Sequence, residues 1–150
     1  MLEEIMDIIP ITFDDIDRIK TLWEGLRAHH RSISTNFKLF YDQFTFEARI
    51  ESLKNRDQLI VYVAQEEMQP IGYCIASIDN LVGEIDSIFI LSRYRRTGIG
   101  SELVSLALKW IEDHGCKTIK VGIAQGNEEA FDFYRRFGFA ERMTIMQKIA

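Results

Sequence analysis

The chain has 150 residues, of which 47% are hydrophobic and 27% are charged, as in an ordinary globular protein. Its 18 Lys and Arg against 23 Asp and Glu give a net charge of -5, which disfavours nucleic acid as a partner because phosphate neutralisation needs a basic surface. No apolar run approaches the ~20 residues of a bilayer span, and the acidic start lacks the basic region of a secretory signal. We therefore expect one cytoplasmic domain over residues 1–150, with no membrane partner.

The first third of the chain predicts a strand followed by two helices. Residues 5–13 read as a strand at a sheet edge or a bulge, because they contain a proline. Asp14 or Asp15 then caps a helix, since apolar residues recur after them with the 3.6-residue period. Those apolar residues are Ile16, Ile19, Leu22, Trp23 and Leu26. A polar join at 29–35 separates this helix from a second one within 36–54.

The remainder of the chain alternates between strands and helices. Strands are expected over residues 57–65, 71–78, 83–91, 117–124 and 141–149. Helices are expected over residues 98–114 and 127–137, and each ends at a glycine. This order predicts an α/β (α+β) fold with a mixed sheet of about six to seven strands, flanked by four helices in three layers.

The two cysteines, Cys74 and Cys116, lie far apart in apolar stretches, without CxxC spacing or a nearby set of histidines. This spacing supports neither a disulfide framework nor a zinc site. We therefore expect two buried thiols and no metal.

Residues 93–101 concentrate basic and small residues just before a predicted helix. A helix N-terminus carries unpaired N–H groups and about half a positive charge, so it attracts anions. Gly98 and Gly100 allow close backbone approach there, while Arg95 and Arg96 bring forked donors that suit phosphate oxygens. The spacing fits neither the dinucleotide fingerprint nor a Walker A motif. The local chemistry leaves two interpretations: a pyrophosphate cradle, or a glycine turn with solvated arginines.

The segment from Arg95 to Gly100 has the R/Q-x-x-G-x-G/A form of the GCN5-related N-acetyltransferases (GNAT). The preceding strand "EIDSIFI" and the downstream "NEEAFDFYRRFGF" match further landmarks of that family in order and spacing. The order of predicted elements is also the family's, so the chain resembles it over nearly its whole length. The resemblance implies the GNAT fold and acetyl-CoA as cosubstrate.

The resemblance also implies roles for individual residues. The pyrophosphate would be held by backbone N–H groups of one loop: Arg95, Arg96, Thr97, Gly98, Ile99 and Gly100, with Ser101 close by. Ile88, Phe89 and Ile90 would offer free backbone groups to the pantetheine arm, and the Ile88 N–H would donate to the thioester carbonyl as in an oxyanion hole. Asn127 would lie against the pantetheine, and Tyr134 would act as the general acid for the thiolate.

Two carboxylates are candidates for the general base. An amine with a pKa near 10.4 arrives protonated at neutral pH, so a base must take its proton. Glu84 matches the position of the catalytic glutamate in histone-acetylating members, and Asp86 is the second candidate, although many relatives lack a base here. By strand alternation both share a face with Ile88 and Ile90, unless a bulge shifts the phase.

The resemblance therefore predicts direct transfer of an acetyl group from acetyl-CoA to a primary amine of a small molecule, without an acyl-enzyme. Two alternatives stay open: an acetyltransferase acting on proteins or peptides, and a CoA-binding regulatory domain without turnover. His29 and His30 lie near the acceptor pocket of relatives, and we expect at most one of them to face a substrate. A homodimer is common among relatives and is an open option here.

Overall fold

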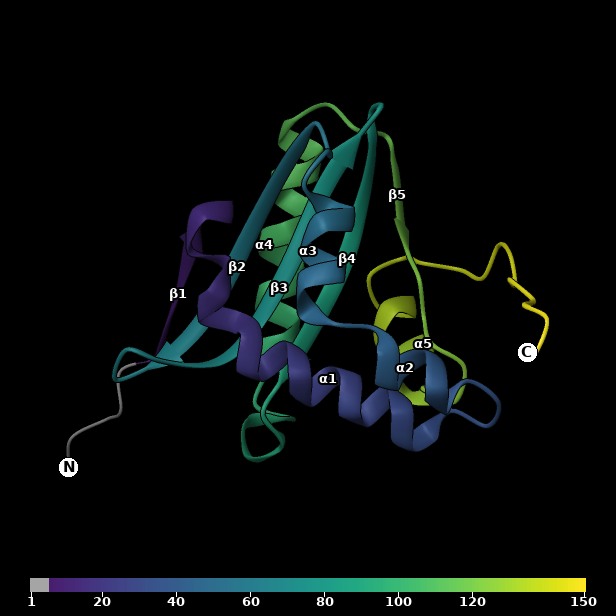
Figure 1. Ribbon diagram of the computed structural model, residues 1–150. Coiled ribbons are helices and arrows are strands. Elements are labelled where there is room, and N and C mark those ends of the chain that lie inside the picture. The colour runs from purple at the N-terminus through teal and green to yellow at the C-terminus, as the bar shows by residue number, and fades with distance from the viewer. Residues whose placement is uncertain (1–5) are drawn as a thin grey trace.

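The computed structural model describes residues 6–150 and contains one five-stranded mixed sheet, with the strand order β1-β2-β3-β4-β5. The strands are β1 (Met6–Ile11), β2 (Gln58–Glu66), β3 (Gln69–Asp79), β4 (Val82–Ile90) and β5 (Thr118–Val121). Neighbours from β1 to β4 are antiparallel, and β5 runs parallel to β4 (Figure 1).

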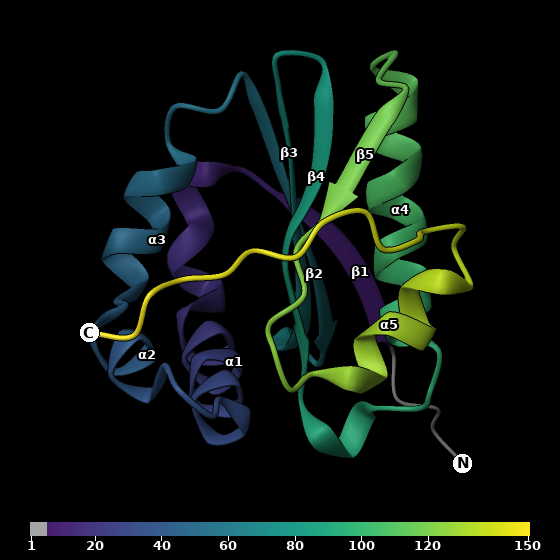
Figure 2. The same cartoon turned by 90° about the vertical axis from the view of Figure 1, so that its right-hand side faces the viewer.

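The helices cover both faces of this sheet. They are α1 (Lys20–Ile33), α2 (Lys38–Gln43), α3 (Phe46–Leu53), α4 (Ile99–Asp113) and α5 (Glu128–Arg135). Figure 2 shows α1, α2 and α3 on one side of the sheet and α4 and α5 on the other, so the expected three-layer α/β fold is confirmed. Within residues 6–150, no helix has the length and apolar content that crossing a membrane requires.

The helices that follow β1 differ from the prediction at their ends. A 3-10 helix at Phe13–Ile19 precedes α1, and its N-cap is Thr12, so the expected cap at Asp14 or Asp15 is wrong. These two aspartates lie instead in the first turn, where they complement the helix dipole. The predicted second helix is two helices, because the Thr45 side chain accepts a hydrogen bond from the Ala48 N–H and begins α3 there.

The predicted strand at 141–149 does not form, so the described part of the sheet has five strands instead of six or seven. The segment runs irregularly from α5 past the end of β5, as the yellow trace in Figure 2 shows. Its apolar side chains Met143, Ile145, Met146 and Ile149 are exposed. Their sequence favours an extended chain, but a strand also needs a neighbouring edge with which to form hydrogen bonds.

Two apolar clusters fill the space between the layers. The first joins α1 and α3 to the sheet through residues such as Trp23, Phe46 and Tyr73, which are 4% exposed or less. The second joins α4 to the opposite face through residues such as Leu103 and Ile85. Both cysteines are free and buried, as expected.

A β-bulge interrupts β4 in the middle of the strand. Ile75 of β3 is paired with Ser87, but the next residue, Ala76, is paired with Ile85. Asp86 is therefore an extra residue on β4, and the alternation of side chains shifts by one position there.

This bulge separates residues that simple alternation would place on one face. Glu84 and Asp86 both form ion pairs with Arg56, which follows α3 in the chain. Ile88 and Ile90 pack instead into the cluster beside α4. The expectation that the carboxylates share a face with Ile88 and Ile90 is therefore wrong, because the extra residue reverses the phase between them.

Gly83 sets the distance between β4 and α4. A Cβ atom at this position would overlap Ile111 Cγ2 and lie 3.1 Å from Ile111 Cδ1. We predict that Gly83→Ala lowers the free energy of unfolding by about 1–3 kcal/mol through overpacking, measured by urea denaturation. Gly122→Ala, where an added Cβ meets no atom within 4 Å, should change stability by less than about 0.5 kcal/mol. Equal losses in the two variants would contradict this account.

Candidate active site

A cavity of about 690 Å³ opens where β4 and β5 stop pairing. The two strands pair only over Val82 to Ile85 and Thr118 to Val121, so the second half of β4 has a free edge. The cavity is bordered by this half-strand, the loop between β4 and α4, the segment after β5, helix α5 and the end of α1. Most of the expected cofactor-binding residues line it: Ile88, Phe89, Ile90, Arg95, Arg96, Gly98, Gly100, Ser101, Asn127 and Tyr134.

The free edge of β4 presents the backbone of Ile88 and Ile90. The Leu91 N–H donates to the Ile71 carbonyl across the β3 edge, with an N–O distance of 2.9 Å. Because backbone groups alternate along a strand, the N–H groups of Ile90 and Ile88 point to the opposite edge, toward the cavity. The Ile90 carbonyl agrees with this direction, since it accepts a hydrogen bond from Arg95 Nε at 2.9 Å. The Ile88 N–H is thus available to a bound molecule.

The loop before α4 presents a row of backbone donors. Among residues 6–150, none of the N–H groups from Arg96 to Ser101 donates a hydrogen bond to another protein group. Gly98 is the N-cap of α4 with a φ of 88°, and Arg96 also has a positive φ of 64°. Successive N–H groups at such a turn and a helix N-terminus form a site suited to an anion.

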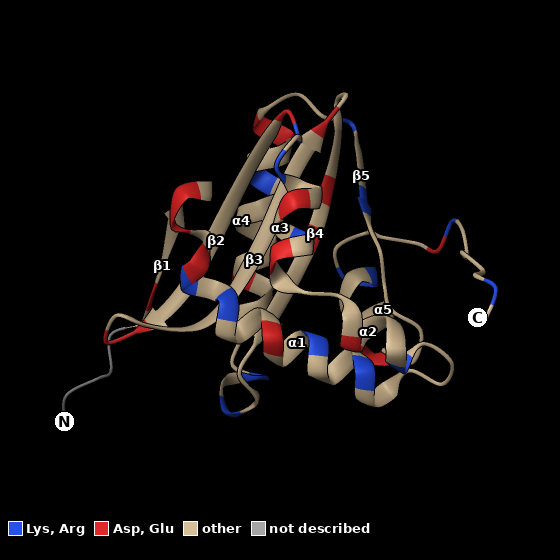
Figure 3. Ribbon diagram, in the orientation of Figure 1, with Lys and Arg blue, Asp and Glu red and all other residues tan. Residues whose placement is uncertain are grey.

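Figure 3 marks the Lys and Arg positions in blue along the ribbon, including those in the loop between β4 and α4. The side chains of the arginines in this loop have different surroundings. Arg95 is held by the Ile90 carbonyl and lies over the Phe89 ring, 5.2 Å from its centroid. Arg93 donates to the Tyr94 hydroxyl and lies outside the cavity lining. Arg96 lines the cavity as Arg95 does, but its guanidinium makes no hydrogen bond or ion pair with the described residues, so it can turn toward a bound anion.

Thr97 and Ile99 contribute no side chain to the cavity lining. The Thr97 hydroxyl donates to the Tyr94 carbonyl, which stabilises the loop turn. Ile99 is buried in the cluster beside α4. Any contact of these two residues with a bound molecule would therefore come from their N–H groups.

Helix α5 brings Asn127 and Tyr134 to the opposite wall of the cavity. Asn127 occupies the N-cap position of α5, but its side chain makes no capping hydrogen bond, so its amide is available to the cavity. Tyr134 is 5% exposed, and burial is the main cause that raises the pKa of its phenol above the ordinary value. Within the described chain, its hydroxyl has no hydrogen-bond partner.

The two carboxylates of β4 differ in their access to the cavity. Glu84 is outside the lining and pairs with Arg56 and Lys120, each at 3.6 Å. Asp86 lines the cavity, and its side chain is 0% exposed to bulk solvent. Neither of its carboxylate oxygens has a hydrogen-bond partner in the described residues, and the nearest cation, Arg56 Nη2, is 3.7 Å away.

The surroundings of Asp86 raise the pKa of its carboxyl to about 6. Burial is the largest cause, and the charge of Glu84 raises the pKa further. The nearby Ser77 hydroxyl and the guanidinium groups of Arg49 and Arg56 lower it in part. Asp86 is therefore ionised at neutral pH but is a stronger base than an ordinary carboxylate.

Both histidines of α1 line the cavity, and that at most one of them faces a substrate stays a prediction. They border its open end together because the last turn of α1 lies across it. Burial, with a smaller contribution from His29, lowers the pKa of His30 to about 4, so His30 is neutral at physiological pH.

A second cavity of about 120 Å³ was not predicted from the sequence. It lies between α1, α2, α3 and β4, and Leu26, His30, Asp86 and Ser87 line both cavities. The spacing of Trp23, Leu26, Arg27 and His30 along one face of α1 is the signal that could have indicated it.

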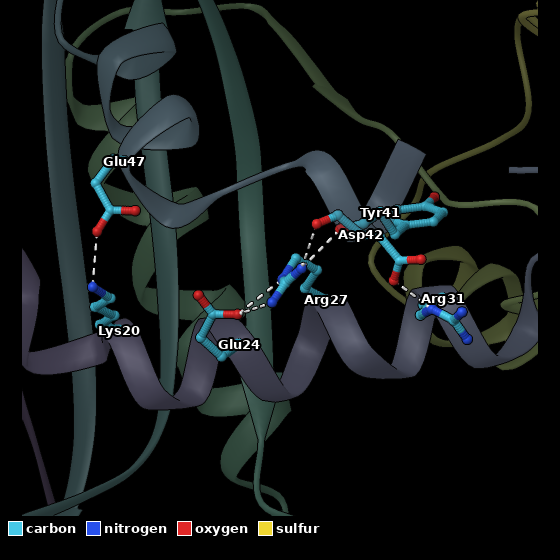
Figure 4. A network of polar contacts seen from close by, with 7 residues as sticks. All are labelled: Lys20, Glu24, Arg27, Arg31, Tyr41, Asp42 and Glu47. Carbon is cyan, nitrogen blue, oxygen red and sulfur yellow. Dashed lines mark hydrogen bonds and ion pairs between the residues drawn. The ribbon is translucent and has the colours of Figure 1, made fainter. Parts of the chain in front are cut away.

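Ion pairs fix the helices around this second cavity (Figure 4). Lys20 on α1 pairs with Glu47 on α3 at 2.8 Å, and Arg31 on α1 pairs with Asp42 on α2. Arg27 also donates to the Tyr41 carbonyl at 2.9 Å. Each exposed pair contributes little alone, but together they set the position of α2 and α3 against α1.

Two curated relatives resemble the chain over most of its length. An uncharacterized N-acetyltransferase of Methanocaldococcus jannaschii is 28% identical over 144 residues, which cover 90% of this chain and 61% of that protein. An N-alpha-acetyltransferase of Sulfolobus acidocaldarius is 27% identical over 143 residues, covering 87% of this chain and 77% of that one. The chain thus spans about three fifths of the length of the first relative.

Solved structures share the fold. An aminoglycoside N-acetyltransferase in complex with CoA has a TM-score of 0.67 at 21% identity, over 99% of this chain and 98% of that one. The family model described as acetyltransferase (GNAT) family matches residues 23–139, which include β4, the loop before α4 and helix α5. This match covers more than half of the sequence, so the chain belongs to the acetyltransferase (GNAT) family.

Proposed function

We propose that the protein is an acetyl-CoA-dependent N-acetyltransferase that acts by direct attack of a primary amine, with a small molecule as the acceptor. The observation that carries this proposal is the row of N–H groups without protein partners from Arg96 to Ser101, next to the free edge of β4. The N–H groups suit a pyrophosphate, and the free strand edge suits an extended chain with amide groups. Acetyl-CoA contains both, joined to an activated thioester.

The described residues fit acetyl-CoA along the whole cavity. The N–H groups of the loop and the helix N-terminus would bind the pyrophosphate, and Arg96 would add a charged donor. The free backbone of Ile88 and Ile90 would pair with the pantetheine amides as a neighbouring strand does. Asn127 lines the same cavity, and its side-chain amide, which makes no capping hydrogen bond, can bind the pantetheine from the side of α5.

Two donors then act at the reacting carbonyl and sulfur. The Ile88 N–H would stabilise negative charge on the carbonyl oxygen, because its direction is fixed by the strand and it needs no reorganisation. Tyr134 would give its proton to the departing thiolate. Its raised pKa favours this role, since the phenol stays protonated at neutral pH until a strong base forms beside it.

Asp86 is better supported than Glu84 as the base that removes the proton of the amine. Asp86 lines the cavity, whereas Glu84 is outside the lining and is neutralised by Arg56 and Lys120. The pKa of about 6 also brings Asp86 closer to the ideal value for a general base at neutral pH. The presence of this base and of Tyr134 in one cavity favours turnover over a purely regulatory CoA-binding domain.

Mutation of Gly98 tests the anion site. Gly98→Asp should weaken CoA binding by roughly a hundredfold or more, because a carboxylate would stand at the N-terminus of α4 in the place of the pyrophosphate. Isothermal titration calorimetry with CoA measures the effect. Gly115→Asp is the matched control, since Gly115 also has a positive φ, of 82°, and an added Cβ meets no atom within 4 Å. The site assignment fails if both variants bind CoA alike.

Removal of the Tyr134 hydroxyl tests the general acid. We predict that Tyr134→Phe lowers kcat at least roughly tenfold, because general acid catalysis contributes about 10²–10⁴ in rate, while affinity for acetyl-CoA changes little. Thiol release from acetyl-CoA in the presence of an amine mixture measures kcat. Tyr62→Phe, which removes a hydroxyl from β2 outside both cavities, should leave kcat near the wild-type value. An unchanged kcat in Tyr134→Phe would exclude the assigned role.

The pH dependence of turnover tests Asp86. For the wild type, kcat/KM should fall below pH 6, as the carboxylate is protonated near its pKa of about 6. Asp86→Asn should lower kcat/KM roughly a hundredfold and remove this acidic limb from the pH profile. Glu84→Gln should retain the limb. If the acidic limb of the pH profile is lost in Glu84→Gln but remains in Asp86→Asn, the base is Glu84 instead.

The same substitution should stabilise the fold at alkaline pH. Folding raises the pKa of Asp86 from the ordinary 3.8 to about 6, so the folded state holds the proton more tightly and stability falls as the pH rises across this window. Asp86→Asn removes this cost, and we expect its free energy of unfolding at pH 8 to exceed that of the wild type by about 1–3 kcal/mol. The difference should shrink toward pH 4. Urea denaturation at both pH values checks it, and a variant that is less stable than the wild type at pH 8 would contradict the destabilising burial of this carboxylate.

A further inference from the structure

The second cavity adjoins the first, with which it shares Leu26, His30, Asp86 and Ser87 in its lining. Its lining combines apolar and aromatic side chains with two arginines and one carboxylate: Trp23, Leu26, Arg27, His30, Tyr41, Phe44, Arg49, Asp86 and Ser87. Asp86 and His30 line both cavities, so they stand at the junction. A molecule seated in the small cavity would therefore present its end to the large cavity beside Asp86.

The carboxylate at this junction has a long ion pair with Arg56, 3.7 Å away, but no hydrogen-bond partner among the described residues. Its side chain is 0% exposed, and neither oxygen accepts a hydrogen bond from the described residues. A buried, ionised group without hydrogen bonds is costly, and a donor group that satisfies it is bound correspondingly well. A primary ammonium brings three donors and the opposite charge, which suits Asp86 before it takes the proton.

The size of the small cavity limits what can follow the amine. Its volume of about 120 Å³ is well below the 690 Å³ of the first cavity, so it suits a short stem better than a bulky group. Trp23, Leu26 and Phe44 provide apolar walls, which favour a hydrocarbon stem.

The charges on the wall disfavour a second amino group. Arg27 is held by Glu24 and by the Tyr41 carbonyl, and Arg49 donates to the Asp86 carbonyl at 2.7 Å. Both guanidinium groups therefore stay at the wall of the cavity. Among the described residues that line it, Asp86 is the one carboxylate, so a second ammonium would meet like charges without a partner of its own.

We propose that the small cavity is the acceptor pocket and that it selects a primary monoamine on a short apolar stem, against polyamines and aminoglycosides. This inference rests on the proposed acetyl transfer. Such a group can come from a free alkylamine, or from the terminal amine of a peptide that begins with leucine or methionine. Both place an amine beside Asp86 with a short apolar stem behind it.

A panel of acceptors tests the selection. Thiol release from acetyl-CoA would be measured with 3-methylbutylamine, leucinamide, a leucine-initiated tetrapeptide, putrescine, spermidine and an aminoglycoside. We expect kcat/KM for at least one apolar monoamine to exceed that for each polycationic acceptor roughly tenfold or more, because one mismatched group in such a pocket changes binding by about 1–3 kcal/mol. The ratio between the free amine and the tetrapeptide identifies the source of the natural acceptor.

A change in the pocket wall tests its position. Tyr41→Ala should enlarge the cavity and shift the preference among alkylamines toward longer stems, such as octylamine, by roughly tenfold in relative kcat/KM. Tyr41→Leu is a milder second variant if the first folds poorly. Leu39→Ala, on the same helix but 65% exposed and outside both cavities, should keep the wild-type preference.

The outcomes separate the two proposals. The acceptor pocket is overturned if thiol release with putrescine, spermidine or the aminoglycoside equals that with the monoamines. It is also overturned if the folded Tyr41 variants keep the wild-type preference for stem length. Either result leaves acetyl transfer intact. Absence of thiol release with every acceptor, while CoA still binds, overturns acetyl transfer and the pocket together.

Discussion

The extra residue at Asp86 in β4 is the constraint on which the candidate site depends. Upstream of it, Ile85 faces α4; downstream, Ser87 contacts Tyr73 on the other side of the sheet, with an O–O distance of 2.6 Å. The shift sends the Asp86 side chain toward α1 and α3 while the backbone of Ile88 keeps its free edge toward β5. Without the bulge, Asp86 would share a face with Ile88 and Ile90, so its carboxylate would point toward α4 instead of α1 and α3.

The bulge also explains why Asp86 destabilises the folded protein. The carboxylate of Asp86 is buried without hydrogen bonds, and Arg56 at 3.7 Å neutralises it only in part. Arg49 contacts the backbone carbonyl of Asp86 and not its carboxylate, so it supports the shape of the bulge but leaves the charge free. A residue that destabilises the protein and faces a cavity is the pattern expected where function, not stability, selects the side chain.

The sequence predicted the features that depend on neighbouring residues. The loop from Arg95 to Gly100 is local, so its position before α4 and its glycine conformation followed from the pattern alone. The bulge at Asp86 depends on the register between β3 and β4, which side-chain alternation within one strand does not record. The small cavity depends on ion pairs between helices, such as Lys20 with Glu47. The predicted strand at 141–149 would need a free sheet edge to pair with, and the segment does not pair with one. These three features required the tertiary structure.

The basic residues of this loop in an acidic chain have a partly structural explanation. Arg95 bridges the end of β4 by binding the Ile90 carbonyl and covering Phe89, and Arg93 stays with Tyr94 at the surface. Arg96 alone among them both lines the cavity and lies at the turn with a positive φ. The proposed anion site therefore depends mainly on backbone N–H groups, which a substitution removes only where it introduces proline. For that reason its weak point is the conformation of Gly98, because the direction of the N–H groups around it changes if that left-handed turn is lost.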